Sequence, residues 1–235
     1  MFRTILAVLT FSAVASAATI TFVTPVGATS AGGAVNASAT FATIANTLTI
    51  TLTDLQNNPG NVGQLLSDLA FVVSTGQTTG SLTSSSGVAR TVASNGSFAD
   101  GGTVAAGWVL QAGFTLCDLC GGAAGPTHTI IGGPNGSNVY AAANSSIAGN
   151  GPHNPFLAGP VTFVLNIPGI TATSTISSAT FSFGTTEGDN VQGCVGAVGA
   201  VGCNPTVPEP ITSGLVGTGL IGLFFLRRRV ATRKV

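Results

Sequence analysis

The four cysteines of this chain are the residues whose type and spacing point most directly to chemistry. Cys117 and Cys120 lie in "CDLC", and Cys194 and Cys203 lie in "CVGAVGAVGC". The first spacing is that of a zinc half-site with His128 nearby, but the C-x8-C spacing of the second pair suits zinc poorly. An even number of cysteines outside the cytoplasm favours two disulfides, for which three pairings are possible. We therefore expect disulfides and no metal, and we favour the two local pairs because their members are close in sequence.

The two histidines, His128 and His153, give no sign of a catalytic site. Neither has a nucleophile and an orienting acid at a recognisable spacing, and the chain has no G-x-S-x-G, H-E-x-x-H or phosphate-loop motif. The segments "ADGG" (99–102) and "EGDN" (187–190) lack the alternating acidic ligands of a calcium loop, so we interpret both as turns. We expect no enzymatic activity and no cofactor. A secreted hydrolase stays open only if a histidine meets an acid and a hydroxyl in the folded chain.

Charge is scarce and unevenly placed. Charged residues make up 6% of the 235 residues, against about 25% in an average globular protein. Between positions 18 and 206, Arg90 is the only base and stands against six acids. Phosphate neutralisation needs a basic footprint, so this composition excludes a nucleic-acid partner. The polar, nearly uncharged body suits contact with extracellular polysaccharide or other surface proteins through hydroxyl and amide groups.

Short alternations of apolar and polar residues, bounded by Gly, Pro and Asn, indicate the elements that must position these groups. The clearest is "NTLTITLTD" (46–54), which places Leu48, Ile50 and Leu52 on one face of a half-buried strand. One helical candidate, 61–69, is a turn or two long. Many short strands with uncharged turns predict an all-β fold, a single β-sandwich or jelly-roll-like ectodomain. The other expected strands are 18–23, 35–44, 69–74, 107–114, 127–131, 161–167 and 176–184.

The outer face of the strand at 46–54 is a row of threonines, at positions 47, 49, 51 and 53. Regularly spaced threonines on a flat sheet can order water and bind ice, but this requires the row to repeat on adjacent strands. The segment 171–175 ("TATST") is the only second candidate, so we interpret the row as the ordinary outer face of a strand. A carbohydrate-binding groove would instead need aromatic residues, and Trp108 and Tyr140 are the only Trp and Tyr.

The N-terminus has the pattern of a secretory signal peptide. Arg3 precedes an apolar stretch at 5–15, and the small residues Ala15 and Ala17 form an A-x-A-like cleavage site before Ala18. The stretch is too short and too rich in Ala and Ser to span a membrane well. Signal peptidase is therefore expected to release a mature chain that begins at Ala18, outside the cytoplasm.

Near the C-terminus, residues 211–226 carry no charge and are followed by Arg227, Arg228 and Arg229. As a helix this segment would be about 24 Å long, against a hydrocarbon core of about 30 Å, so it would span the membrane only marginally. Clustered arginines remain on the cytoplasmic side, which places the body outside. We expect one transmembrane helix at 211–226 and a basic tail at 227–235.

Directly before this segment, Pro208 and Pro210 favour extended backbone around Val207 and Glu209. A Val-Pro-Glu-Pro sequence, a short glycine-containing apolar span and a terminal arginine cluster together resemble the PEP-CTERM sorting signal of exported bacterial proteins. The resemblance implies that an exosortase, a polytopic membrane enzyme, recognises the motif at 207–210 and processes the protein. Some family naming labels this segment an ice-binding protein C-terminal domain, and that label is no evidence of ice binding.

The resemblance extends less specifically to the body, since segments at 48–74 and 154–188 resemble parts of PEP-CTERM ectodomains. It implies a signal peptide at 1–17, an ectodomain at 18–206 and a sorting segment at 207–235. The protein would be exported, held transiently in the inner membrane, and then located at the cell surface or outside the cell. We expect a surface or matrix protein of unknown molecular activity, with a carbohydrate- or ice-binding adhesin as the alternative.

Overall fold

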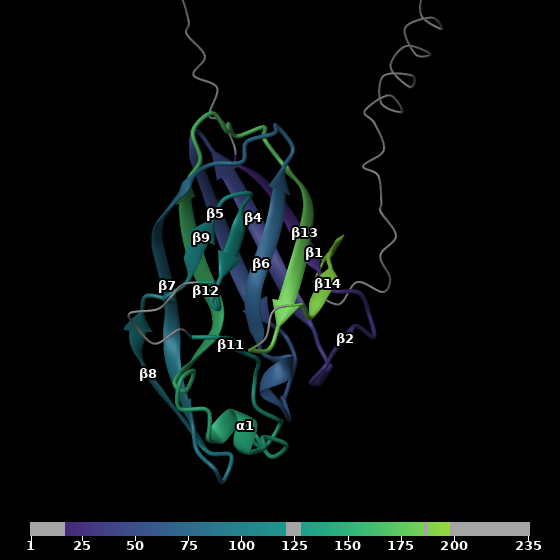
Figure 1. The fold of residues 1–235 in the computed structure, drawn as a ribbon, viewed down its shortest axis with the longest axis vertical. Helices are drawn as coiled ribbons and strands as arrows, with labels where there is room; N and C mark the ends of the chain where they lie inside the picture. Colours follow the sequence, from purple (N-terminus) through teal and green to yellow (C-terminus); the bar gives the residue numbers. More distant parts are fainter. Residues whose placement is uncertain (1–16, 121–127, 186–187, 198–235) are drawn as a thin grey trace, which may run out of the picture. The chain divides into compact units, whose positions relative to one another are not determined.

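The computed structural model describes residues 17–120, 128–185 and 188–197, and these residues form an all-β domain (Figure 1). The helical elements in this part of the chain are the 3₁₀ turn η1 (Val62–Gln64) and the single turn α1 (Ser145–Ala148). The all-β prediction is therefore confirmed. The chain divides into two compact units, Met1–Cys203 and Asn204–Val235, and only the first contains described residues.

The predicted signal peptide and sorting segment lie outside the described residues, apart from Ala17 at the signal cleavage site. Within those residues, no helix has the length and apolar character needed to cross a membrane. The predicted transmembrane helix at 211–226 lies outside the described residues and stays a prediction.

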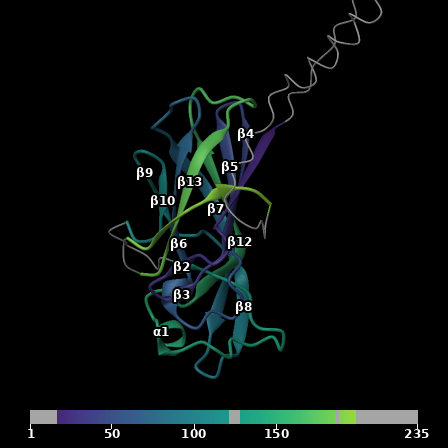
Figure 2. The ribbon, with the colours of Figure 1, turned by 90° about the vertical axis from the view of Figure 1, so that its right-hand side faces the viewer.

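Hydrogen bonds join thirteen strands into one sheet, which folds into two facing layers (Figures 1 and 2). We call them layer A and layer B. Layer A consists, in spatial order, of β15 (Cys194–Val195), β1 (Ala18–Val23), β4 (Ala37–Ile44), β5 (Thr47–Asp54), β12 (Phe156–Asn166), β7 (Ser81–Val92) and β8 (Phe98–Val104). Layer B consists of β9 (Val109–Gln111), β10 (Thr115–Cys117), β6 (Leu66–Val73), β13 (Ile176–Phe183) and β14 (Asn190–Gln192). A separate small hairpin pairs β2 (Thr29–Ser30) with β3 (Gly33–Ala34).

The two layers are connected on both sides. On one side, the short strand β11 (Ile130–Ile131) pairs antiparallel with β6 and parallel with β12. On the other, β14 pairs with β13 and β15 pairs with β1, and only Gly193 separates them along the chain. A side chain at Gly193 would approach the ring of Phe181 to 2.8 Å, so glycine lets the strand pass close to the core as it changes layer.

The hydrophobic core fills the space between the layers. Aromatic rings run through it from layer A to layer B: Phe22 contacts Phe41, Phe41 contacts Phe71, and Phe71 stacks on Phe114, with centroid separations of 5.9, 5.4 and 5.2 Å. A second, smaller cluster around Tyr140 lies between α1 and the ends of β7 and β12. Burial of these side chains provides the main favourable free energy of folding.

Alternation located most of the strands, and the differences have physical reasons. The strand at 47–54 keeps Leu48, Ile50 and Leu52 fully buried, as expected. The long strand β7 and its neighbour β8 were not predicted, because β7 is mostly polar and is held by pairing with β12. The turn predicted at 99–102 is wrong, since these residues belong to β8.

The helix predicted at 61–69 is also wrong beyond its first turn. Asn61 and Gln64 form a capping box, which starts a helical turn, but Leu65 is already extended and Leu66 begins β6. The apolar residues after Gln64 are needed in the core as a strand of layer B, and this tertiary requirement ends the helix.

Candidate functional site

A polar groove lies on the outer face of layer B. Pairing of five strands places two rows of outward side chains beside one another, and the hollow over them has a volume of about 600 Å³. This volume is within the usual range of ligand sites. The residues that line it, which we call the polar groove, are Asp68, Ala70, Gln111, Thr115, Cys120, Thr180, Ser182, Gly188 and Asn190.

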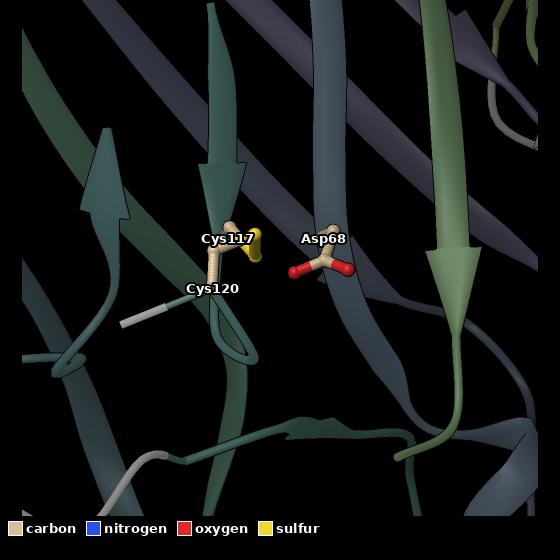
Figure 3. A group of neighbouring side chains, drawn as sticks. All are labelled: Asp68, Cys117 and Cys120. Carbon is tan, nitrogen blue, oxygen red and sulfur yellow. A yellow bond between two sulfur atoms is a disulfide. The ribbon is translucent and has the colours of Figure 1, made fainter. Parts of the chain in front are cut away.

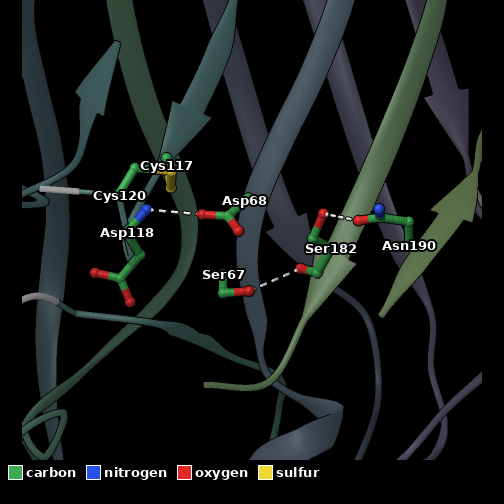
Figure 4. Close-up of a disulfide and its surroundings, with 7 residues drawn as sticks. All are labelled: Ser67, Asp68, Cys117, Asp118, Cys120, Ser182 and Asn190. Carbon is green, nitrogen blue, oxygen red and sulfur yellow. Dashed lines mark hydrogen bonds between the residues drawn. A yellow bond between two sulfur atoms is a disulfide. The ribbon is translucent and has the colours of Figure 1, made fainter. Parts of the chain in front are cut away.

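A disulfide between Cys117 and Cys120 closes one side of the groove, beside Asp68 on β6 (Figure 3). It is the local pair expected from the sequence, and its Cα atoms are 5.4 Å apart. The carboxylate is fixed in place, because the backbone N–H of Asp118 donates to Asp68 Oδ1 at 2.9 Å (Figure 4). Asp68 is 6% exposed and is a residue that sequence reasoning missed as a site candidate.

Asp68, Cys117 and Cys120 are also the described residues whose arrangement best fits a metal ion, since their ligand atoms lie within 4.8 Å of one another. Zinc is bound by thiolates, and sulfur atoms joined in a disulfide are not thiolates. In the disulfide state these residues therefore do not fit a zinc site. His128, the nearby histidine considered from the sequence, is buried and its Nδ1 contacts the carbonyl of Pro155.

The opposite side of the groove is a ladder of hydroxyl and amide groups on β13 and β14. Ser182 Oγ donates to Asn190 Oδ1, and Thr180 Oγ1 donates to Gln192 Oε1 at 3.0 Å (Figure 4 shows the first pair). The bond from Ser182 uses the amide oxygen of Asn190 and leaves its NH₂ group as a donor for a ligand.

One histidine does meet an acid. His153 Nδ1 lies 3.7 Å from Asp118 Oδ2, and Asp118 is 1% exposed. A hydrolase would also need a hydroxyl nucleophile within hydrogen-bond reach of the histidine. The two side chains form a buried contact next to the disulfide turn that contains Asp118.

The second surface of interest is the outer face of layer A, where hydroxyl groups align across strands. The register of four strand pairs produces one row of five hydroxyl residues and a second row with three, and Thr21 and Thr40 are hydrogen-bonded to each other at 2.9 Å. We call this surface the hydroxyl face. Its first row is Ser86, Thr162, Thr51, Thr40 and Thr21. Its second row is Ser84, Val164, Thr49, Ala42 and Thr19, in which Val164 and Ala42 carry no hydroxyl group.

The hydroxyl face meets only in part the condition set from the sequence, that the threonine row of 46–54 repeat on adjacent strands: Thr51 lies between Thr40 and Thr162, whereas Thr49 lies between Ala42 and Val164. The residues that repeat it were not the predicted ones, because 171–175 lies in the connection between β12 and β13 and not in a strand. Register between distant strands decides which side chains are neighbours, and a single sequence does not reveal it.

The aromatic residues proposed for a carbohydrate groove do not line one. Trp108 is 4% exposed and donates from Nε1 to the carbonyl of His128, and Tyr140 is 1% exposed. Arg90 donates to both carboxylate oxygens of Asp100 at 2.6 Å, and its guanidinium lies 4.2 Å from the ring centroid of Phe98. The hydrogen bonds from Arg90 lower the pKa of Asp100 below its ordinary value.

The second expected disulfide is only half described. Cys194 is a buried residue of β15, and its Sγ lies 3.6 Å from the carbonyl of Val23. Cys203 lies outside the described residues, so a Cys194–Cys203 bond stays a prediction.

The described residues thus define an all-β domain with one polar groove and one hydroxyl face. In a comparison with protein-family models, residues 206–229 match the PEP-CTERM protein-sorting motif, so the chain carries this sorting motif, as the C-terminal residues predicted. The match includes Val207, Pro208, Glu209, Pro210 and the three arginines from Arg227 to Arg229. Searches of curated proteins and of solved structures found no significant match. The motif indicates an exosortase-targeted protein that is exported and passes through the membrane before processing.

Proposed function

We propose that this chain is a non-enzymatic protein of the bacterial cell surface or extracellular matrix, processed by an exosortase at 207–210. Signal peptidase would cleave after Ala17, and the segment at 211–226 would hold the chain in the inner membrane until processing. The ectodomain is a β-sandwich of jelly-roll-like form. The observation that carries the proposal is the match of residues 206–229 to the sorting motif.

The domain supports the predicted signal cleavage. Ala18 is the first residue of β1, pairs with Thr43 of β4, and donates its backbone N–H to the carbonyl of Ala172 at 3.2 Å. The first described strand therefore starts at the first residue of the expected mature chain, so cleavage after Ala17 would leave every described strand intact.

Mass spectrometry of the protein isolated from its own host tests the processing. We expect the mature protein to begin at Ala18 and to lack the tail at 227–235. Replacing the motif carboxylate by Glu209→Gln should leave the tail on the protein, whereas Glu187→Gln, the only other glutamate substitution available, should be processed normally. An intact tail on most wild-type molecules would refute processing and leave a simple membrane anchor.

A second candidate function is an adhesin that binds a neutral polysaccharide, and the hydroxyl face favours it. Aligned hydroxyl groups on neighbouring strands present donors and acceptors without charge. The same rows would suit ice only on a flat sheet, and adjacent strands of a sheet are rotated by roughly 20–25° relative to one another. We therefore retain polysaccharide over ice as the ligand of this candidate.

A further inference from the structure

We propose that the polar groove of layer B binds a neutral sugar unit of a polysaccharide, through hydrogen bonds from its hydroxyl groups to Asp68 and the surrounding amides. This inference rests on the adhesin function above. It assigns the contact between the protein and the polysaccharide to the polar groove and not to the hydroxyl face.

The floor of the groove leaves room for a ring-shaped ligand. Strand register places Thr115, Ala70 and Thr180 side by side across β10, β6 and β13, and the methyl group of Ala70 is the smallest side chain of the row. Gly188, at the rim, adds no side chain at all. A sugar ring can therefore approach the centre of the row while taller polar groups surround it.

Those polar groups have the chemistry that a pair of adjacent hydroxyls requires. The oxygens of the Asp68 carboxyl group accept hydrogen bonds, so beside the bond from the Asp118 amide to Oδ1 they can accept from a sugar O–H donor. Asp68 is nearly buried and its position is set by the Asp118 amide, so little side-chain entropy is lost on binding. The amides of Gln111 and Asn190, on opposite rims, supply both donors and acceptors.

Other classes of ligand fit the groove less well. Among the described residues, the lining contains no base, and Arg90, the only base between 18 and 206, is bonded to Asp100, so an anion would find no cationic partner there. A hard cation would find one carboxylate in the described lining, where several oxygen ligands are needed. An apolar ligand would find neither aromatic nor large aliphatic side chains among the described lining residues.

Affinity electrophoresis of the full chain tests the proposal directly. The protein is purified in a detergent without a sugar head group and run through native gels that contain dextran, laminarin or galactomannan. We expect at least one of these neutral polysaccharides to retard the wild type. Asp68→Asn should weaken that binding at least tenfold, because it removes the charge while its remaining oxygen still accepts from the Asp118 amide. Asn190→Ala, at an exposed position, should weaken it severalfold.

Thr51→Val is the matched control, because it removes a central hydroxyl from the hydroxyl face and leaves the groove intact. Circular dichroism and the fluorescence of the single Trp108 should be unchanged in every variant. If Thr51→Val abolishes retardation and Asp68→Asn does not, the groove is refuted while the adhesin function stands. If none of the three polysaccharides retards the wild type, the groove and the adhesin function both fall, and the sorting function is unaffected.

Discussion

Asp54 is the residue whose replacement should change the pH dependence of stability most clearly. It is the last residue of β5, is 3% exposed, and accepts a hydrogen bond at Oδ1 from the backbone N–H of Gln56 at 2.9 Å. Burial raises the pKa of this carboxyl well above its ordinary value of 3.8, and the hydrogen bond from Gln56 opposes that effect only in part.

The sign of the effect follows from proton linkage. Below pH 3.8 the carboxyl is protonated in both the folded and the unfolded chain. As the pH rises, the unfolded chain loses this proton first, so the folded chain binds more protons and the free energy of unfolding falls. One proton gives a slope of at most about 1.4 kcal/mol per pH unit, until the pH passes the raised pKa of the folded state.

Asp54→Asn removes this proton and keeps the acceptor for Gln56. The free energy of unfolding of the variant minus that of the wild type should therefore increase with pH above about pH 4, by up to about 1.4 kcal/mol per pH unit, until the pH passes the raised pKa of Asp54. Denaturant unfolding of residues 18–203, followed by Trp108 fluorescence at a series of pH values, measures this difference. The difference in slope, and not the absolute stability, carries the test, because the new amide changes local hydrogen bonding at every pH.

Asp100→Asn is the control. Since Arg90 lowers the pKa of Asp100, its contribution to stability is lost only as the pH falls below the ordinary aspartate range. The Asp100 variant should be displaced from the wild type by a constant amount over the same window. Parallel curves for the wild type and Asp54→Asn would show that Asp54 is ionised in the folded state and would refute the reasoning.

Three further substitutions test the fold. Phe41→Ala removes a fully buried ring that contacts both layers, and should cost about 3–5 kcal/mol of unfolding free energy in denaturant titration. Gly132→Ala should abolish folding, because its new Cβ would overlap the carbonyl of Gln56, and loss of the near-ultraviolet circular dichroism would report it. Replacing Cys117 and Cys120 together by serine should cost about 2 kcal/mol, since the disulfide closes only a four-residue loop.

Each of these has a clear contrary outcome. A Phe41→Ala protein with wild-type stability would contradict the core between the layers. Gly102→Ala, where an added Cβ meets nothing within 4 Å, should fold normally, so an equal loss at Gly102 and Gly132 would remove the steric argument. A reductant should lower the stability of the wild type more than that of the serine variant, which lacks the Cys117–Cys120 bond. An equal loss in both proteins would show that this bond contributes nothing to stability.

The alternating segments were predictable because local pattern and tertiary burial agree in them. In β5, the apolar positions Leu48, Ile50 and Leu52 all face the core, and the intervening threonines face outward. β7 was not predictable, since the polar residues of "SLTSSSGVARTV" carry no burial signal and form a strand only through pairing with β12. The helix predicted at 61–69 was wrong because the local signal and the tertiary requirement disagree there. A genuine capping box starts a helical turn, but the core requires the residues that follow it as a strand.

The candidate sites divide in the same way. The local disulfide could be expected from the spacing of Cys117 and Cys120, since three residues of separation already bring their Cα atoms within bonding range. Nothing in the sequence marks Asp68 as a groove residue, because its neighbours Ser182 and Asn190 are more than a hundred residues away in the chain. The outward polar positions Thr180 and Ser182 on the expected strand at 176–184 were the only available signal, and they do not say which strands are adjacent.

By itself, the sequence determined that this protein carries an export and sorting motif, and it determined the all-β character of the domain. Sorting motifs are read by processing enzymes as short linear segments, so their chemistry is complete in the order of residues from Val207 to Arg229. Strand pattern is equally local, since alternate side chains point to opposite faces whatever the partner. The tertiary structure alone decided which strands pair and in which register. Those pairings bring Asp68, the disulfide and the amides of distant strands into one groove, and align the threonines of layer A into rows.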